Sequence, residues 1–180
     1  MLFASLLTPV FAGWFYLYPA IEFHQYLTNW GLVAVFSSLC ISAYMPYSKT
    51  YRKKPKLMAL NHALMSLAIL MQLLITVVYW TMLHKEVIKK NSHNMTAVVY
   101  QYAAHSLPAI ACSYNLSVTD FLFYRGYTTF VLGIGVLFLG INFVSYLATG
   151  HVTYWFLNWS DPMLSIIAST SLLTLGVGFV

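Results

Sequence analysis

The chain has 180 residues, of which 60% are hydrophobic, 17% aromatic and only 7% charged, and its net charge is +5. A soluble globular domain carries about a quarter of its residues as Asp, Glu, Lys and Arg, so this composition excludes an ordinary soluble domain. It is too apolar for a disordered chain. The two cysteines, Cys40 and Cys112, are too few for a disulfide scaffold and too far apart for a zinc motif. The composition therefore indicates an integral membrane protein.

Uncharged stretches of spanning length follow one another along the sequence. A helix needs about 20 mostly apolar residues to cross the hydrocarbon core of a bilayer. We therefore expect an all-α, polytopic membrane helix bundle with about six transmembrane helices and short loops, forming a single integral membrane domain over residues 1–180. The predicted spans lie near residues 3–20, 27–45, 58–83, 96–117, 128–148 and 162–180. The first is expected to be a retained helix, because a signal peptide would begin with basic residues.

The basic residues predict which side of the membrane each connection faces. Five of the nine lie between the second and third predicted spans, and Arg125 lies between the fourth and fifth, on the same side. The opposite side has three, Lys85, Lys89 and Lys90. Lys and Arg in short loops are retained on the cytoplasmic side or its equivalent, so the side with six basic residues is expected there. Since the cluster lies between two spans, we interpret it as a loop that touches lipid headgroups, and expect no nucleic-acid partner.

Polar groups inside the hydrocarbon are costly without internal partners, so they are the informative positions. His105 lies about ten residues into the fourth predicted span, and Gln101 lies one helical turn earlier on the same face. Pro108 leaves the carbonyl of Ala104 without its helical partner and favours a bend. A bend beside two stacked polar side chains is typical of a cavity wall, in which Gln101 would contact substrate. The alternative is a histidine satisfied by a neighbouring tyrosine or amide within the bundle.

Several other chemistries lack their sequence signatures. No His-x-x-x-His or Glu-x-x-His pair lies on a predicted span, and a metal or haem site needs two or more ligands at matched depth. We expect no metal and no cofactor. A Gly-x-Ser-x-Gly nucleophile elbow is missing as well. Cys40 and Cys112 have no obvious activating base nearby, which favours an inert role in the core.

Three motifs occur in the order seen in one known family. They are the stretch Ala20-Ile-Glu-Phe-His-Gln-Tyr-Leu-Thr-Asn-Trp30, the stretch Ala104-His-Ser-Leu-Pro108 and the stretch Ala148-Thr-Gly-His-Val-Thr-Tyr-Trp-Phe-Leu157. Together they resemble the androgen-induced protein family, which includes the androgen-dependent tissue-factor-regulating protein. The likeness covers nearly the whole chain. Family members are six-span membrane hydrolases that cleave esters formed between a fatty acid and a hydroxy fatty acid.

By position, the resemblance implies that Thr28 is the nucleophile and His105 the general base. A threonine hydroxyl becomes an effective nucleophile when a base accepts its proton. This chain departs from the family where Gln101-Tyr102 replaces an Asn-His pair, and where Trp155 replaces a proline. The predicted span boundaries also place Thr28 and His105 roughly 12 Å apart along the membrane normal, at about 1.5 Å per residue.

A second class of function stays open. With minimal loops and many aromatic residues, the chain could be a non-catalytic accessory subunit of a large membrane assembly, such as a mitochondrial respiratory or ATP-synthase complex, that keeps an enzyme's fold without its activity. The hydrolase hypothesis predicts an endomembrane or plasma-membrane protein whose partners are the bilayer and a lipid substrate. The subunit hypothesis predicts the mitochondrial inner membrane and other membrane subunits as partners.

Overall fold

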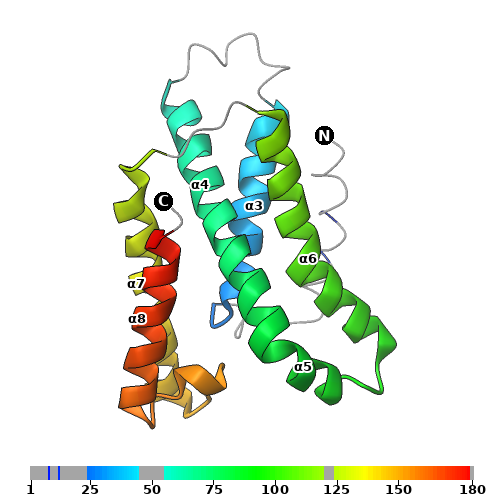
Figure 1. Cartoon of the computed structure of the whole chain (residues 1–180), viewed down its shortest axis with the longest axis vertical. Coiled ribbons are helices and arrows are strands. Elements are labelled where there is room, and N and C mark those ends of the chain that lie inside the picture. Colours follow the sequence, from blue (N-terminus) through cyan, green and yellow to red (C-terminus); the bar gives the residue numbers. More distant parts are fainter. Residues whose placement is uncertain (1–7, 9–11, 13–23, 45–54, 120–123, 179–180) are drawn as a thin grey trace.

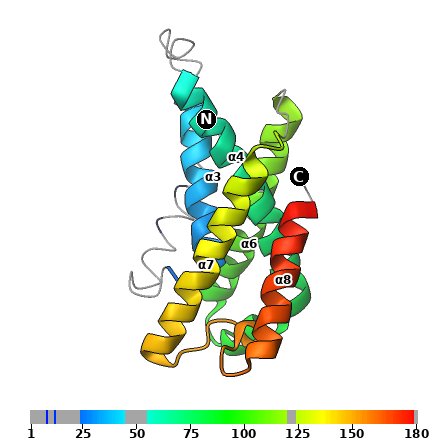
Figure 2. The ribbon, with the colours of Figure 1, turned by 90° about the vertical axis from the view of Figure 1, so that its left-hand side faces the viewer.

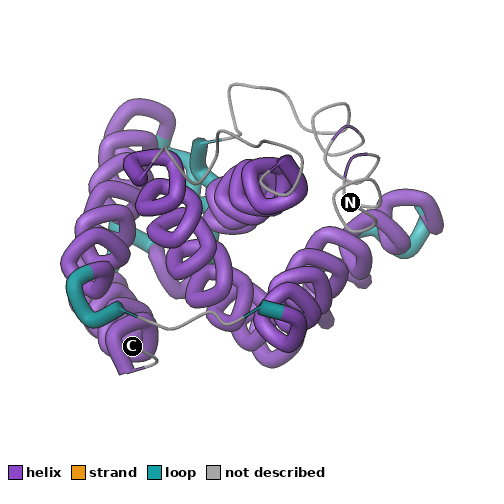
Figure 3. The backbone as a smooth tube through the Cα atoms, turned by 90° about the horizontal axis from the view of Figure 1, so that it is seen from above, coloured by secondary structure: helices purple, strands orange, loops and turns teal. Residues whose placement is uncertain are grey.

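The structure, a computed structural model, describes residues 8, 12, 24–44, 55–119 and 124–178, and these residues form helices and short connections without a strand (Figures 1 and 3). The expected all-α class is therefore confirmed for this part of the chain. In chain order, the elements from residue 24 onward are α3 (Leu27–Tyr44), α4 (Pro55–Val78), the π-helix η3 (Tyr79–Leu83), α5 (His84–Lys90), α6 (Met95–Val118), α7 (Tyr127–Thr149), the 3₁₀ turn η4 (Trp155–Leu157) and α8 (Pro162–Gly178).

Three helical stretches among the described residues are long and apolar enough to cross a membrane: Leu27–Tyr44, Pro55–Lys90 and Tyr127–Thr149. These stretches indicate an integral membrane protein, but they are fewer than the six predicted spans. Helix α6 has the length but carries Gln101, His105 and Asn115, which lower its hydropathy. The described apolar part of α8, Pro162–Thr174, is shorter than a span. The span predicted near 3–20 lies outside the described residues, apart from Thr8 and Ala12.

The third predicted span is longer than its uncharged stretch suggests. Instead of a polar loop after Leu83, α4 continues through the π-helix η3 into α5, so that 36 residues from Pro55 to Lys90 are helical. Lys89 and Lys90 lie in the last turn of α5, where basic side chains stabilise the C-terminal end of the long helix. The connection to α6 is then only residues 91–94, and the Asn94 side chain accepts a hydrogen bond from the Ala97 N–H at 3.1 Å as an N-cap.

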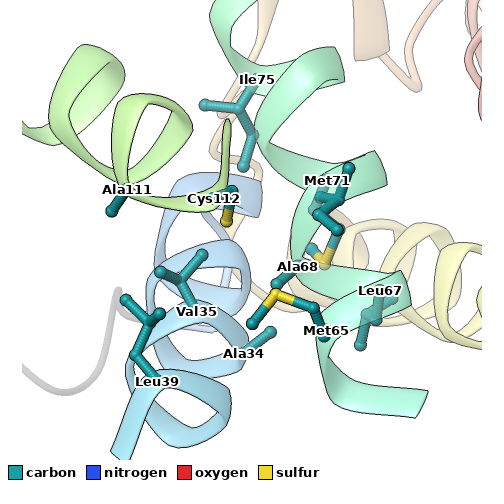
Figure 4. Packing of buried hydrophobic residues seen from close by; sticks show 11 residues of the cluster. Ala34, Val35, Leu39, Met65, Leu67, Ala68, Met71, Ile75, Ala111 and Cys112 are labelled. Carbon is teal, nitrogen blue, oxygen red and sulfur yellow. The ribbon is translucent and has the colours of Figure 1, made fainter. Parts of the chain in front are cut away.

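Helix α4 lies in the middle of the bundle. Figures 1 and 2 show α3 and α6 on one side of it and α7 and α8 on the other. The main core joins α3, α4 and α6 (Figure 4); its fully buried members include Val35, Ala68 and Ala111. A second apolar cluster centres on Phe138 of α7 and on the α7–α8 connection, and contains Tyr154, Phe156 and Leu157. This connection lies at the same end of the bundle as α5 (Figure 1).

Helices α3 and α4 pack closely against each other at Gly31. A Cβ atom on Gly31 would lie 2.6 Å from Ile75 Cδ1 and 2.8 Å from Gln72 Nε2. Both neighbours are almost fully buried. Farther along the same contact, Ser38 donates a hydrogen bond to Asn61 Oδ1 at 3.1 Å, and Asn61 Nδ2 donates to Ser42 Oγ at 3.0 Å. Buried polar side chains therefore fix the register of the two helices.

We expect Gly31→Ala to destabilise the protein by about 1–3 kcal/mol, the usual cost of overpacking a well-filled core. Gly140→Ala is the matched control, because a Cβ atom there meets nothing within 4 Å and alanine favours a helix over glycine. Thermal unfolding of both variants in detergent micelles checks the prediction. Equal melting temperatures for the two variants would show that the helices are not in close contact at Gly31.

Candidate functional site

Thr28 lies in the first turn of α3 and is 6% exposed. The α7–α8 connection holds this end of the helix. The N–H of Leu27, the first helical residue, donates to the Tyr154 hydroxyl at 3.0 Å, so this hydroxyl satisfies one of the N–H groups that a helix start leaves without a partner. Thr153 Oγ1 also donates to Gln25 Oε1 at 3.2 Å. The segment around Tyr154 thus anchors the backbone that carries Thr28.

His105 lies on α6 and is 6% exposed. Its ring stacks on Tyr79, with centroids 3.9 Å apart and ring planes at 9°. Its Nε2 atom lies 3.2 Å from Gln101 Oε1. Since an amide oxygen accepts hydrogen bonds, this contact favours the tautomer with the proton on Nε2, in which Nδ1 is the basic nitrogen. Tyr79 is the first residue of the π-helix, an irregularity that often occurs at functional sites. Tyr79 therefore holds the plane of the imidazole, and Gln101 favours one of its two tautomers.

Close to Pro108, the backbone of α6 forms a hydrogen bond with α4. Pro108 lies inside α6, which continues to Val118. The hydroxyl of Thr76 donates to the backbone carbonyl of His105 at 3.1 Å. A side-chain hydroxyl on a neighbouring helix commonly satisfies carbonyl groups near a proline in a membrane helix. The contact ties the backbone of His105 to α4 one turn before Tyr79, which stacks on the imidazole.

Thr28, Gln101 and His105 line one cavity of about 200 Å³. Its wall also includes Tyr79, Tyr154 and, at the end formed by α5, Glu86 and Lys90. The difference in depth expected between Thr28 and His105 is thus not an obstacle to a shared cavity. The reason is the helical extension after Leu83: α5 adds seven residues, about 10 Å at 1.5 Å per residue, before the chain turns back. The first turns of α6 therefore lie beyond the start of α3.

The cavity adjoins an apolar channel within the bundle. Thr28, Tyr79 and His105 also line a smaller cavity of about 30 Å³. This neck shares Leu27, Phe138 and Leu172 with a third cavity of about 70 Å³, which lies between α4, α7 and α8 and is lined almost wholly by aliphatic side chains. We call this third cavity the apolar channel. A polar opening, then the Thr28 hydroxyl and the His105 imidazole, and then the apolar channel follow one another in space. This order suits an amphipathic ligand with a reactive group in its middle.

Two residues of the site, Tyr79 and Tyr154, could not be assigned to it from the sequence. Tyr79 gives no signal, because one more aromatic in an apolar span is indistinguishable from core. Tyr154 falls within the motif 148–157 on which the family resemblance rests, but its contact with α3 follows from the tertiary fold. Burial raises the pKa of the Tyr154 hydroxyl above its ordinary value, against the opposing effect of the hydrogen bond from Leu27. The hydroxyl therefore keeps its proton at physiological pH.

Removing the Tyr154 hydroxyl tests its role at the start of α3. We expect Tyr154→Phe to lower the stability by about 1 kcal/mol, since the partly buried Leu27 N–H loses its acceptor, and to lower any activity that depends on Thr28. Tyr44→Phe at the other end of α3, where the side chain is 56% exposed, should change neither. Melting temperatures of the two variants decide this. If they are the same, the hydroxyl does not stabilise the helix start.

The remaining candidates lie elsewhere. Cys112 is buried in the main core and Cys40 is exposed on α3. The His62 ring packs against Tyr127 at the opposite end of the bundle, with ring centroids 5.3 Å apart and the planes tilted by 35°. Among the described residues, no three His, Cys, Asp or Glu side chains gather as metal ligands would.

Comparison of the chain with known proteins finds no matching family model, curated protein or solved structure.

Proposed function

We propose that this protein is a membrane-embedded hydrolase of lipid esters, related to the androgen-induced protein family, with six transmembrane helices of which α3, the α4–α5 helix and α7 are three. Its substrates are esters of a fatty acid with a hydroxy fatty acid. One observation carries the proposal: Thr28 and His105, from helices distant in sequence, line a single cavity that adjoins an apolar channel. A hydroxyl, a base and a space for an acyl chain are the parts that such a reaction needs.

The reaction proceeds in two steps. In the first, the Thr28 hydroxyl oxygen attacks the ester carbonyl while His105 Nδ1 accepts its proton. The tetrahedral intermediate then collapses, and the imidazolium returns the proton to the departing hydroxy fatty acid, leaving the acyl group on Thr28. In the second step a water molecule, deprotonated by the same imidazole, attacks the acyl-threonine. The proton passes back to the Thr28 oxygen as the fatty acid leaves. Gln101 acts by holding the imidazole in the reactive tautomer.

The two ends of the cavity system suit the two ends of the substrate. The apolar channel between α4, α7 and α8, with a volume of about 70 Å³, takes the part of the acyl chain nearest the ester. The wider cavity opens beside Glu86 and Lys90, which are exposed on α5 and supply the aqueous side from which water enters. Lys90 carries a charge complementary to the free carboxylate of the hydroxy fatty acid. The ester carbonyl then lies beside the Thr28 hydroxyl, on the side away from His105, so that Nδ1 can accept the hydroxyl proton.

An acylating phosphonate probe tests the proposal directly. The full chain in native membranes should be labelled covalently, and an ester of a fatty acid with a hydroxy fatty acid should compete with the probe. The alternative, a non-catalytic subunit of a large membrane assembly, predicts no labelling and comigration with other subunits after mild detergent extraction. Absence of labelling in folded protein would overturn the hydrolase proposal. Comigration with mitochondrial inner-membrane complexes would then support the subunit.

A further inference from the structure

A second, larger cavity lies at the opposite end of the bundle from Thr28 and His105. Its volume is about 540 Å³, and it lies where α3 and α6 end and α4 and α7 begin (Figure 1). Ten described residues line it, and seven of them have a polar side chain: Ser42, Asn61, His62, Asn115, Thr119, Tyr124 and Tyr127. None of the ten is acidic. Such a density of hydrogen-bonding groups is unusual for an otherwise apolar bundle.

The polar wall is partly organised and partly available for a ligand. Asn61 is fixed between Ser38 and Ser42 by two hydrogen bonds. Asn115 instead donates its amide to the sulfur of Met65, at 3.6 Å. A thioether is a weak acceptor, so an oxygen anion in the cavity would be a better partner for this amide. The Tyr127 ring packs against His62, which holds its side chain at the cavity wall.

The charge at this end of the bundle favours an anion. Lys56, in the first turn of α4, and Arg125, next to Tyr124, are both exposed. In the sequence, four further basic residues, Lys49, Arg52, Lys53 and Lys54, stand between Tyr44 and Pro55, and one acidic residue, Asp120, follows Thr119. Basic residues beside membrane-spanning helices attract anionic lipid headgroups. Met58, Ala59 and Met65 form the apolar part of the lining.

We propose that this cavity binds a phosphate-bearing group, the headgroup of an anionic phospholipid. The phosphate lies among Asn115, Tyr127 and Arg125, and the glycerol end of the acyl chains follows the methionine side of the cavity. The site is separate from the Thr28–His105 cavity, with which it shares no lining residue. It therefore does not depend on the hydrolase proposal. Bound lipid would join the ends of α3, α4, α6 and α7 and stabilise the bundle.

The test measures lipid-dependent stability of the purified full chain in detergent. Phosphatidic acid or phosphatidylglycerol should raise the melting temperature by several degrees and in a saturable way, whereas phosphatidylcholine should not. Inorganic phosphate and glycerol phosphate form the third arm. If they stabilise the protein as well as the lipids do, the site takes phosphate from a free anion and the lipid assignment is wrong. Equal effects of anionic and zwitterionic lipids would overturn the whole proposal.

Variants locate the effect. Arg125→Gln and Asn115→Leu should each weaken the lipid response by about tenfold in the concentration required, because a charge-assisted hydrogen bond or an amide donor to phosphate is lost. Lys89→Gln removes the same charge from an exposed position at the other end, on α5, and should leave the response unchanged. If all three variants respond as the native chain does, the lipid binds elsewhere and the assignment to this cavity fails.

Discussion

Replacing Thr28 by alanine is expected to abolish covalent labelling by an acylating phosphonate and to lower ester hydrolysis by roughly 10³-fold or more, the usual loss when a catalytic nucleophile is removed. The methyl group that remains cannot form the acyl intermediate. His105→Ala should cause a loss of similar size, because the threonine hydroxyl then has no base. The double variant should be no less active than either single variant, since the two residues act as one unit.

Matched controls separate catalysis from folding. Thr28→Ser keeps the hydroxyl and should retain measurable labelling. Thr129→Ala removes an exposed threonine from the first turn of α7, and His93→Ala removes an exposed histidine from the α5–α6 connection; both should behave as the native chain. Melting temperatures of all variants show which of them fold. Undiminished labelling in folded Thr28→Ala protein would contradict the assigned nucleophile.

Helices with charged residues or turn-forming residues at both ends could be predicted from the sequence. The predicted spans 27–45 and 128–148 agree within two residues with α3 (Leu27–Tyr44) and α7 (Tyr127–Thr149). The two ends of α7 are marked in the sequence by Arg125-Gly126 before the helix and by Gly150 after it. Gly150 has a φ of 69°, the left-handed conformation that ends many helices and favours glycine. Composition and local signals decide such boundaries.

The end of the third predicted span could not be found in this way. The apolar stretch ends at Leu83, because charged residues follow it: Lys85, Glu86, Lys89 and Lys90. A prediction from hydropathy therefore ends the helix there. Lys and Glu nevertheless form helices well. The backbone therefore continues into α5. Because the length of that extension determines the level at which α6 begins, the relative position of Thr28 and His105 depended on a feature that hydropathy does not record.

The candidate site was predictable as residue types but not as a place. Polar side chains in apolar surroundings singled out Gln101 and His105, and the family resemblance added Thr28. The contact between Gln101 and His105 follows from helical spacing alone. The stacking of Tyr79 on His105 depends on a local π-helix, and the contact of Tyr154 with the start of α3 joins residues 127 positions apart. Neither leaves a pattern in a single sequence.

On the proposed function, the apolar channel limits the length of the acyl chains that are hydrolysed, and a larger side chain at Gly135 would narrow this channel. Gly135 lies on α7 in the channel wall, and a Cβ atom there would lie 2.7 Å from Leu173 Cδ2 of α8. Leu173 is only partly buried, unlike the neighbours of Gly31, so its side chain has room to move and the helices can accommodate the change. A leucine at position 135 would then occupy the space of about four methylene groups of a bound acyl chain.

We expect Gly135→Leu to lower the hydrolysis of long-chain esters by about 200-fold, because each excluded methylene is worth about 0.8 kcal/mol of apolar burial and about four are lost. Short-chain esters should be cleaved as before, since Thr28 and His105 lie outside the channel.

Gly133→Leu is the control, because Gly133 lies two residues earlier on the same helix and a Cβ atom there meets nothing within 4 Å. Measuring kcat/KM over a series of acyl lengths distinguishes the two variants. A uniform loss across all lengths would mean that the channel does not hold the acyl chain, and a length-dependent loss in Gly133→Leu would mean that the chain lies on the outer face of α7 instead.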